Sequence, residues 1–223
     1  MRKRDCTRYS ITGNIEGEFE PGSTVLKNKL GIRSRRRMDA REFEALRRTQ
    51  ARCFRSATAD TTITNALILE MHRHFLGGIY PWAGRYRTVN LSKPGFVWPP
   101  AGRIPQNMAA FERDALKTRT PCRPGPLERV AESIAVVHAE FLLIHAFREG
   151  NGRLARLIAG IMALQAGCPP PEFGFRLRKN RSRYLRAVKR GYLRDYGELT
   201  EVVIDAIRRA KKAAGRLSGR KRA

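Results

Sequence analysis

One stretch of twelve residues, HAFREGNGRLAR at positions 145–156, gathers side chains that suit phosphate chemistry. It lies between two strongly apolar segments, which predicts a helix, a glycine-containing loop and a second helix. The backbone N–H groups of Gly150, Asn151 and Gly152 would then lie at a helix N-terminus, where unpaired donors and the helix dipole favour an anion. Glycine also permits the backbone conformations that an anion-binding loop needs.

The other side chains of this stretch complete a candidate phosphoryl- or nucleotidyl-transfer site. Arg153 and Arg156 are three residues apart and share a helix face, so both could hold phosphates of one polyphosphate. Glu149 would repel such a ligand unless Mg²⁺ joins carboxylate and phosphate. His145 could take a proton from an attacking hydroxyl. The ordinary alternative is a helix connection that contains Gly and Asn and ends in a structural histidine.

Hydrophobic periodicity predicts a helical domain around this site. Helices are expected at about 39–56 with Asp39 as N-cap, 63–76, 104–117, 127–145, 153–167, 182–193 and 198–214. The helix at 127–145 leaves little polar surface and should be the central buried one. Strand-forming residues at 86–98, interrupted by turn residues at 92–95, predict one β-hairpin. The fold class is therefore all-α with a single hairpin.

Composition divides the chain into an irregular N-terminal arm (1–38), a main domain (39–207) and a basic tail (208–223). The net charge is +25, with 35 arginines. That charge favours nucleic acid, nucleotides or acidic partners, although a coding bias toward arginine would scatter such residues over a solvated surface. Charge runs near positions 35–37 and in the tail keep nucleic-acid binding open as an alternative function.

Cysteines and histidines offer no metal or disulfide pattern. The four cysteines are far apart, and His72 and His74 point to different helix faces. No apolar run approaches the ~20 residues of a membrane span, so we expect no membrane partner and a cytoplasmic location.

The stretch at 145–156 resembles the signature of the Fic/Doc family, HxFx[DE]GNGRxxR. Every fixed position matches, and the one departure is Ala146, where the family usually has proline. The segment IYPWAGRYRTVNLSK is similar to the family's flap hairpin, which pairs with a target segment by strand addition. The resemblance implies a Fic-type helical domain with one hairpin flap.

The resemblance further implies AMP transfer from ATP to a hydroxyl side chain of a protein target, a Ser, Thr or Tyr, with release of pyrophosphate. It makes His145 the general base and Glu149 the Mg²⁺ ligand. It assigns nucleotide binding to Gly150, Asn151, Gly152, Arg153 and Arg156, and target docking to Leu91, Ser92 and Lys93. Phe147 should be a core anchor and Arg148, which has no role in the pattern, should be solvated. Asn180 and Tyr184 are candidates for base contacts, with packing as an equal alternative.

Three alternatives stay open beside this interpretation. Doc-like relatives phosphorylate their targets, but their motif departs from the GNGR kept here. An inhibitory [ST]xxxE[GN] helix matches positions 12–17 with Glu16, yet Gly13 and Gly17 disfavour a helix there. We therefore expect a toxin-like enzyme whose inhibitory helix comes from a small antitoxin protein. The last alternative is a basic nucleic-acid-binding protein with an inactive Fic-like core.

Overall fold

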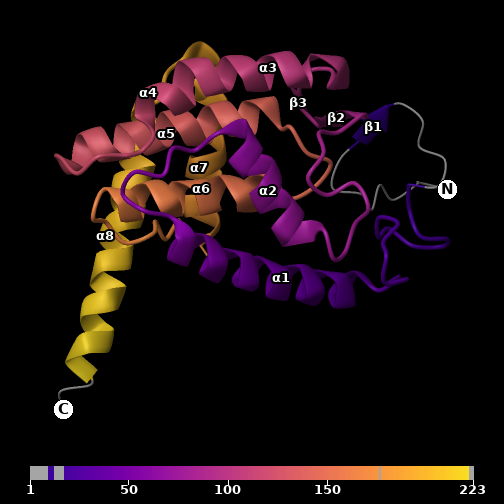
Figure 1. Ribbon diagram of the computed structural model, residues 1–223, viewed down its shortest axis with the longest axis horizontal. Coiled ribbons are helices and arrows are strands. Elements are labelled where there is room, and N and C mark those ends of the chain that lie inside the picture. The colour runs from indigo at the N-terminus through magenta and orange to yellow at the C-terminus, as the bar shows by residue number, and fades with distance from the viewer. Residues whose placement is uncertain (1–9, 13–17, 176, 221–223) are drawn as a thin grey trace.

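The computed structural model of the protein describes residues 10–12, 18–175 and 177–220. Most of them are helical, and one short antiparallel sheet lies at one end of the molecule (Figure 1). The fold class predicted from the sequence is confirmed. The elements are β1 (Ser10–Thr12), α1 (Arg35–Ser56), α2 (Asn65–Leu76), β2 (Asn90–Lys93), β3 (Phe96–Val97), the 3₁₀ turn η1 (Ala101–Arg103), α3 (Ile104–Phe111), the π-turn η2 (Glu112–Leu116), α4 (Lys117–Arg119), α5 (Leu127–Ile144), α6 (Asn151–Gln165), α7 (Arg178–Arg190), the 3₁₀ turn η3 (Gly191–Leu193) and α8 (Gly197–Arg220).

Helix α5 is the centre of the core. It packs against α3, α6, α7 and α8, and nearly every residue from Val130 to Ile144 is buried. Figure 1 shows α5 and α6 between α3 on one side and α1 on the other, and α1 and α6 are in contact. The predicted central helix is confirmed. Its apolar residues on all faces are explained because it has neighbours on all sides.

The first helix begins four residues earlier than the sequence analysis predicted. Its N-cap is Ser34, whose hydroxyl accepts a hydrogen bond from Arg37 N–H at 3.4 Å, so the expectation that Asp39 is the cap is wrong. Asp39 instead lies inside α1 and pairs with Arg35 at 3.0 Å, one turn away. Ser34 and Asp39 are both favourable N-cap residues, so residue type alone does not show where the helix begins. The position of the chain relative to the core decides it.

The segment before α1 and the segment from position 208 differ from the separate arm and tail that the sequence predicts. Within residues 18–34, Val25 and Leu26 are buried against Phe75 and Tyr80, so this part of the chain belongs to the body. At the other end α8 runs to Arg220, beyond the predicted end near 214, and its last turns project away from the molecule (Figure 1). The basic segment that starts at position 208 therefore begins inside a helix.

The predicted hairpin is confirmed as β2 and β3, which are joined by Pro94 and Gly95 with a φ of 72° at the glycine. Ser92 and Lys93 lie in β2 itself and not in the turn. A third strand, β1, pairs antiparallel with the other side of β2, so the sheet order is β1-β2-β3. Sequence analysis missed β1, because a strand of three residues has no measurable alternation.

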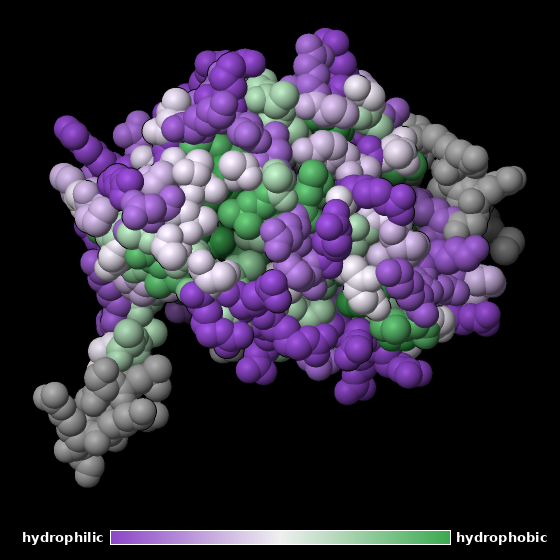
Figure 2. Space-filling view, in the orientation of Figure 1, coloured by the Kyte–Doolittle hydropathy of each residue, from purple (hydrophilic) through white to green (hydrophobic). Residues whose placement is uncertain are grey.

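Hydrophilic side chains cover most of the face shown in Figure 2, and hydrophobic residues gather near its middle. Many arginines pair with neighbouring carboxylates on exposed helix faces, as Arg41 and Arg48 do with Glu44. Part of the positive charge is therefore ordinary helix-surface charge.

Close packing of α6 against α1 gives a stability prediction. A Cβ on Gly160 would lie 2.6 Å from the ring of Phe54, so Gly160→Ala should overpack this contact and lower the free energy of unfolding by about 1–3 kcal/mol. The matched control is Gly215→Ala in α8, where no atom lies within 4 Å and alanine should stabilise by up to ~1 kcal/mol. Denaturant unfolding measures both; a Gly160→Ala protein as stable as the control would contradict the packing.

Candidate active site

The stretch at 145–156 forms the buried connection between α5 and α6 and the first turns of α6. His145 caps α5 in the left-handed region with φ 53° and ψ 55°, and Gly150 precedes α6 with φ 88°. A non-glycine residue in that region is uncommon and must be held by its surroundings. All six residues of the loop, 145–150, are buried. Its backbone polar groups therefore need partners inside the protein.

Asn151 closes the loop. Its side-chain Oδ1 accepts a hydrogen bond from the Phe147 N–H at 2.9 Å, and its Nδ2 donates to the Phe147 carbonyl at 2.7 Å. The Phe147 ring is fully buried and stacks on His72 with 3.8 Å between ring centroids. The expected core role of Phe147 is confirmed. Both polar atoms of the Asn151 side chain are engaged within the loop, so only the backbone N–H of Asn151 is available to a ligand.

His72 on α2 holds the next part of the loop. Its Nδ1 accepts from the Gly84 N–H at 2.9 Å, so Nε2 carries the proton and donates to the Glu149 carbonyl at 3.1 Å. Burial lowers the pKa of His72 to about 4, and the ring is neutral at pH 7. Sequence analysis considered His72 only as a metal ligand and missed this contact, which joins positions 77 residues apart.

Arg87 ties the hairpin to the loop. Its N–H donates to the Ala146 carbonyl at 2.9 Å, and its Nε donates to the His145 carbonyl at 2.8 Å. The two Nη atoms donate to the carbonyls of Val89 and Pro99, which flank the hairpin, at 2.8 and 2.6 Å. One buried guanidinium thus fixes the hairpin at the end of α5. Nothing in the sequence pattern singles out Arg87 among the many arginines.

His145 itself is a neutral, oriented imidazole. Its Nδ1 lies 3.2 Å from the Leu142 carbonyl, so Nδ1 is the protonated nitrogen and Nε2 carries the lone pair. Burial lowers the pKa of His145 to about 3, and the nearby Lys93 acts in the same direction. The Trp98 ring lies 4.2 Å away between centroids, and its Nε1 donates to the same Leu142 carbonyl at 3.0 Å.

The first turn of α6 offers backbone donors. The Gly150 N–H donates to Oε1 of Glu149 at 2.9 Å. For the N–H groups of Asn151 and Gly152, the part of the chain that the structure describes supplies no acceptor. Arg156 Nη1 lies 3.6 Å from where a Cβ on Gly152 would be, so this guanidinium extends back over the same turn. Open amides and a guanidinium together favour an anion.

Arg153 is held by two carboxylates. Its Nη1 pairs with Oε2 of Glu42 on α1 at 2.5 Å, and its Nη2 pairs with Oε1 of Glu149 at 3.3 Å. The guanidinium lies over the Phe75 ring, 4.9 Å from its centroid. Glu42 is almost fully buried and also accepts from the Tyr80 hydroxyl at 2.6 Å. Sequence analysis missed Glu42, because it lies 111 residues from Arg153.

Arg156 is oriented by an aromatic pocket. It lies over the Phe175 ring at 5.3 Å, and it hydrogen-bonds to the Tyr184 hydroxyl. The His138 Nδ1 lies 3.2 Å from the Ala155 carbonyl and is therefore the protonated nitrogen, so the Tyr184 hydroxyl donates to His138 Nε2 at 2.7 Å. The lone pairs of the Tyr184 oxygen are then directed to Arg156.

The two residues proposed for base contacts have other partners. Tyr184 is 5% exposed and its hydroxyl lies between His138 and Arg156. Asn180 donates through Nδ2 to the Gly174 carbonyl at 3.2 Å. These contacts favour the packing alternative for Tyr184.

The hairpin residues proposed for docking lie near His145. Leu91 is buried against Trp98, whereas Ser92 and Lys93 are half-buried. The Lys93 ammonium lies 5.6 Å from the centroid of the Trp98 ring, which itself contacts His145. The structure thus brings the hairpin and the His145 loop together.

The expectation that Arg148 is solvated is wrong. Arg148 is buried, and its Nε forms an ion pair with Glu18 of the N-terminal arm, which is 16% exposed at its side chain. Burial of both partners requires the pairing, because an unpaired buried charge is costly. Glu16, the candidate inhibitory residue, lies outside the described residues, and Thr12 of the same match lies in β1.

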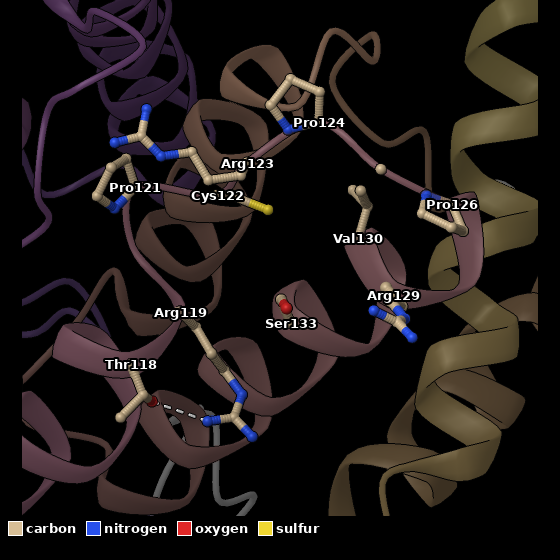
Figure 3. A pocket seen from close by; sticks show the side chains of 11 residues that line it. Thr118, Arg119, Pro121, Cys122, Arg123, Pro124, Pro126, Arg129, Val130 and Ser133 are labelled. Carbon is tan, nitrogen blue, oxygen red and sulfur yellow. Dashed lines mark hydrogen bonds between the residues drawn. The ribbon is translucent and has the colours of Figure 1, made fainter.

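A separate cavity of about 310 Å³ opens at the other end of α5 (Figure 3). Its lining includes Arg119, Arg123 and Arg129 around Pro121 and Ser133. It contains none of the residues 145–156 and is not the candidate active site. Arg123 is already paired with Asp60 at 2.8 Å.

Among the described residues no group of three or more His, Cys, Asp or Glu side chains could cage a metal ion. Cys53, Cys122 and Cys168 are free thiols. None of the helices in the described ranges combines the length and apolarity needed to cross a bilayer.

Residues 62–163 match the model of the Fic/DOC family. The protein adenylyltransferase Fic of Nematostella vectensis is 35% identical over 150 residues, which cover 65% of this chain and 34% of that protein. The probable protein adenylyltransferase y4lH of Sinorhizobium fredii is 32% identical over 154 residues, 66% of this chain and 74% of that protein. The chain belongs to the Fic/DOC family. It spans about a third of the Nematostella relative and about three quarters of the Sinorhizobium one.

Solved structures show the same fold. The BepC protein of Bartonella tribocorum, a VirB-translocated effector with bound AMPPNP, has a TM-score of 0.71 at 18% identity, over 86% of this chain and 96% of that one. The N-terminal FIC domain of Bep8 from Bartonella sp. 1-1C has a TM-score of 0.72 at 18% identity, over 86% and 94%. The predicted Fic-type helical fold is confirmed.

Acid should destabilise this site. Burial lowers the pKa of His138 and His145 to about 3 and of His72 to about 4, from an ordinary 6.5. Below pH 6.5 the unfolded chain therefore binds more protons than the folded chain. The contribution of these neutral histidines to the free energy of unfolding is fully present above that pH and is lost as the pH falls toward 3–4. Between pH 7 and 5 the loss should be about 2 kcal/mol per histidine.

Urea unfolding at several pH values measures this loss, with the exposed His74→Gln variant as control, which should follow the wild-type curve. Equal stability at pH 7 and pH 5 would contradict the burial of three neutral imidazoles.

Tyr184→Phe should weaken the binding of a polyphosphate at Arg156, for which ATP is the probe. The change removes the oxygen that accepts from Arg156 and leaves His138 Nε2 without its donor, so we expect a several-fold higher Kd for ATP and about 1–2 kcal/mol less stability. Tyr192→Phe is the control, because Tyr192 is 50% exposed. Calorimetric titration with ATP measures the affinity; an unchanged Kd would show that Tyr184 does not orient Arg156.

Proposed function

We propose that this protein transfers AMP from ATP to a hydroxyl side chain of a target protein and releases pyrophosphate. One observation carries the proposal: a neutral, oriented His145 lies beside a helix N-terminus with two open amides and an arginine extended over it. Relatives named protein adenylyltransferases support the same activity.

His145 serves as the general base. Its Nδ1 is engaged with the Leu142 carbonyl, so Nε2 is the nitrogen that takes the proton of the target hydroxyl. The hydroxyl oxygen then forms a bond to the α-phosphorus, and the bond from that phosphorus to the bridging oxygen of the β-phosphate breaks. The electron pair of that bond leaves with pyrophosphate. Because the pKa of His145 is low before ligands bind, the imidazole is neutral at pH 7 and can accept a proton.

The phosphates would bind at the start of α6. The amides of Asn151 and Gly152 and the Arg156 guanidinium supply donors there, and Gly150, with φ 88°, turns the chain into α6 and packs closely on Phe75 and Leu76 of α2. Arg153 is paired with Glu42 and Glu149, so a phosphate that binds Arg153 competes with these carboxylates. The β- and γ-phosphates are the anions assigned to Arg153 and Arg156.

The donor set fits one Mg²⁺ ion that is shared with the substrate. Glu149 is a single buried carboxylate beside the open amides, and Mg²⁺ is usually held by one or two carboxylates plus phosphate oxygens. Glu149 would hold the ion, which would neutralise charge on the leaving pyrophosphate. Arg153 would then lose one of its two carboxylate partners to the metal.

The target would dock on the hairpin. Strand β2 carries Leu91, Ser92 and Lys93, and Arg87 and Trp98 fix this strand close to His145. An extended target segment that pairs with β2 would therefore pass near the general base. Backbone pairing selects an extended conformation more than a sequence.

ATP labelled at either the α- or the γ-phosphate tests the reaction. With Mg²⁺ and a lysate as acceptor, the 223-residue chain should transfer the α-label, and His145→Ala should lower transfer by at least 100-fold because general-base catalysis contributes about 10²–10⁴. His74→Ala, an exposed histidine, is the matched control.

Transfer of the γ-label would instead indicate the phosphotransferase alternative. Equal α-labelling by wild type and His145→Ala would overturn the proposal.

Other expectations from the sequence stay predictions: control by a small antitoxin, cytoplasmic location, and nucleic-acid binding as an alternative function.

A further inference from the structure

The edge of β2 that faces away from β3 is the surface of interest, and we call it the docking edge. A strand with one unpaired side presents a row of N–H and C=O groups that can bind another extended segment. In the sheet order β1-β2-β3, β1 is the strand that covers this side of β2 among the residues that the structure describes. Without β1 the docking edge would be open.

The docking edge lies next to the candidate active site. Arg87 donates to the His145 carbonyl and to the hairpin, and the Trp98 ring contacts the His145 ring. Lys93 on β2 is near enough to His145 to lower its pKa. The position of this edge is therefore set by the same contacts that hold the general base.

The occupant of the docking edge is a segment of this chain. Ser10, Ile11 and Thr12 pair antiparallel with Ser92, Leu91 and Asn90. Figure 1 shows β1 directly beside β2. The pairing covers three residues, so it supplies few hydrogen bonds, and a longer or better-fitting segment can replace it.

The arm is also fixed on the other side of the site. Glu18, six residues after Thr12, forms the buried ion pair with Arg148, which is the direct neighbour of Glu149. Lys27 N–H donates to the Glu18 carbonyl at 2.8 Å and holds this residue against the body. The arm is thus attached at β2 and at the catalytic loop.

We propose that Ser10–Thr12 is the resident internal ligand of the docking edge, and that a target protein must displace it to reach His145. The effect on access to His145 rests on the proposed function, whereas the binding of Ser10–Thr12 to the docking edge does not. The partner it defines is an extended polypeptide segment whose backbone N–H groups are free to pair, so proline is excluded at paired positions. Because β1 must be displaced first, the apparent affinity for the target equals the intrinsic affinity multiplied by the fraction of molecules in which the docking edge is open.

Two substitutions in the chain of 223 residues test whether β1 occupies the docking edge. The Trp98 N–H donates to the Leu91 carbonyl, so Leu91 faces β3, and its neighbours Asn90 and Ser92 face β1. The double variant Ile11→Pro, Thr12→Pro therefore removes the N–H of Thr12, the partner of Asn90, and its two prolines disfavour the pairing of the whole strand. The control, Ile11→Ala, Thr12→Ala, keeps both N–H groups. Hydrogen exchange without nucleotide should be at least tenfold faster at the Asn90 and Ser92 amides, which face β1, in the proline variant than in wild type, and close to wild type in the control.

A labelled peptide tests the binding site directly. A fluorescein-labelled peptide with the sequence of residues 8–13, RYSITG, should bind the proline variant at least tenfold more tightly than it binds wild type or the alanine control, because only the proline variant leaves the edge open. Fluorescence anisotropy measures the Kd, and added peptide should restore slow exchange at the Asn90 and Ser92 amides of the proline variant.

The proposal requires both results. Unchanged exchange in the proline variant, or equal peptide binding by all three proteins, overturns it. Neither measurement needs ATP or catalysis, so loss of AMP transfer in the His145→Ala test would overturn the proposed function and leave this result unaffected. If both proposals hold, α-label transfer to other proteins should rise several-fold in the proline variant and not in the control.

Discussion

The buried turn between α5 and α6 is the constraint on which the site depends. Six residues reverse the chain without access to water, so each buried polar group of the loop must find a partner. The Phe147 backbone pairs with the Asn151 side chain, the Glu149 carbonyl with His72, and the His145 and Ala146 carbonyls with Arg87. These partners come from α6, from α2 and from the approach to the hairpin. Satisfying one loop therefore fixes three other parts of the molecule around it.

This arrangement explains how His145 can adopt a left-handed conformation. The conformation costs free energy for a residue with a side chain, and it persists only where the surroundings determine it. Here the carbonyl is held by Arg87, Nδ1 by the Leu142 carbonyl, and the ring by Trp98. The same contacts that stabilise the backbone also set the tautomer. The position and the protonation state of His145 are thus two results of the same packing.

The sequence predicted the local part of the site and missed the long-range part. Residues 145–156 were recognised because glycine, arginine and histidine at fixed spacing have direct chemical meaning. Glu42, His72 and Arg87 were missed, because each acts through a tertiary contact and each has an unremarkable neighbourhood in sequence. The burial of Arg148 is unpredictable for the same reason: its partner, Glu18, is 130 residues away. The start of α1 is ambiguous in sequence because Ser34 and Asp39 are both suitable caps.

The small sheet must meet two opposing requirements. Its edge must avoid pairing with unrelated chains, and it must stay accessible to a target segment. An uncovered edge strand is a site for unwanted pairing with other chains, yet an enzyme that docks targets by strand addition needs such an edge. A short internal strand reconciles the two requirements, because it covers the edge with few hydrogen bonds and can yield to a longer partner. The ion pair between Glu18 and Arg148 keeps the arm close to the site when the strand is displaced, which raises the effective concentration for return. The arm then has a function that its irregular composition did not indicate, and Arg148 has one that the motif did not assign.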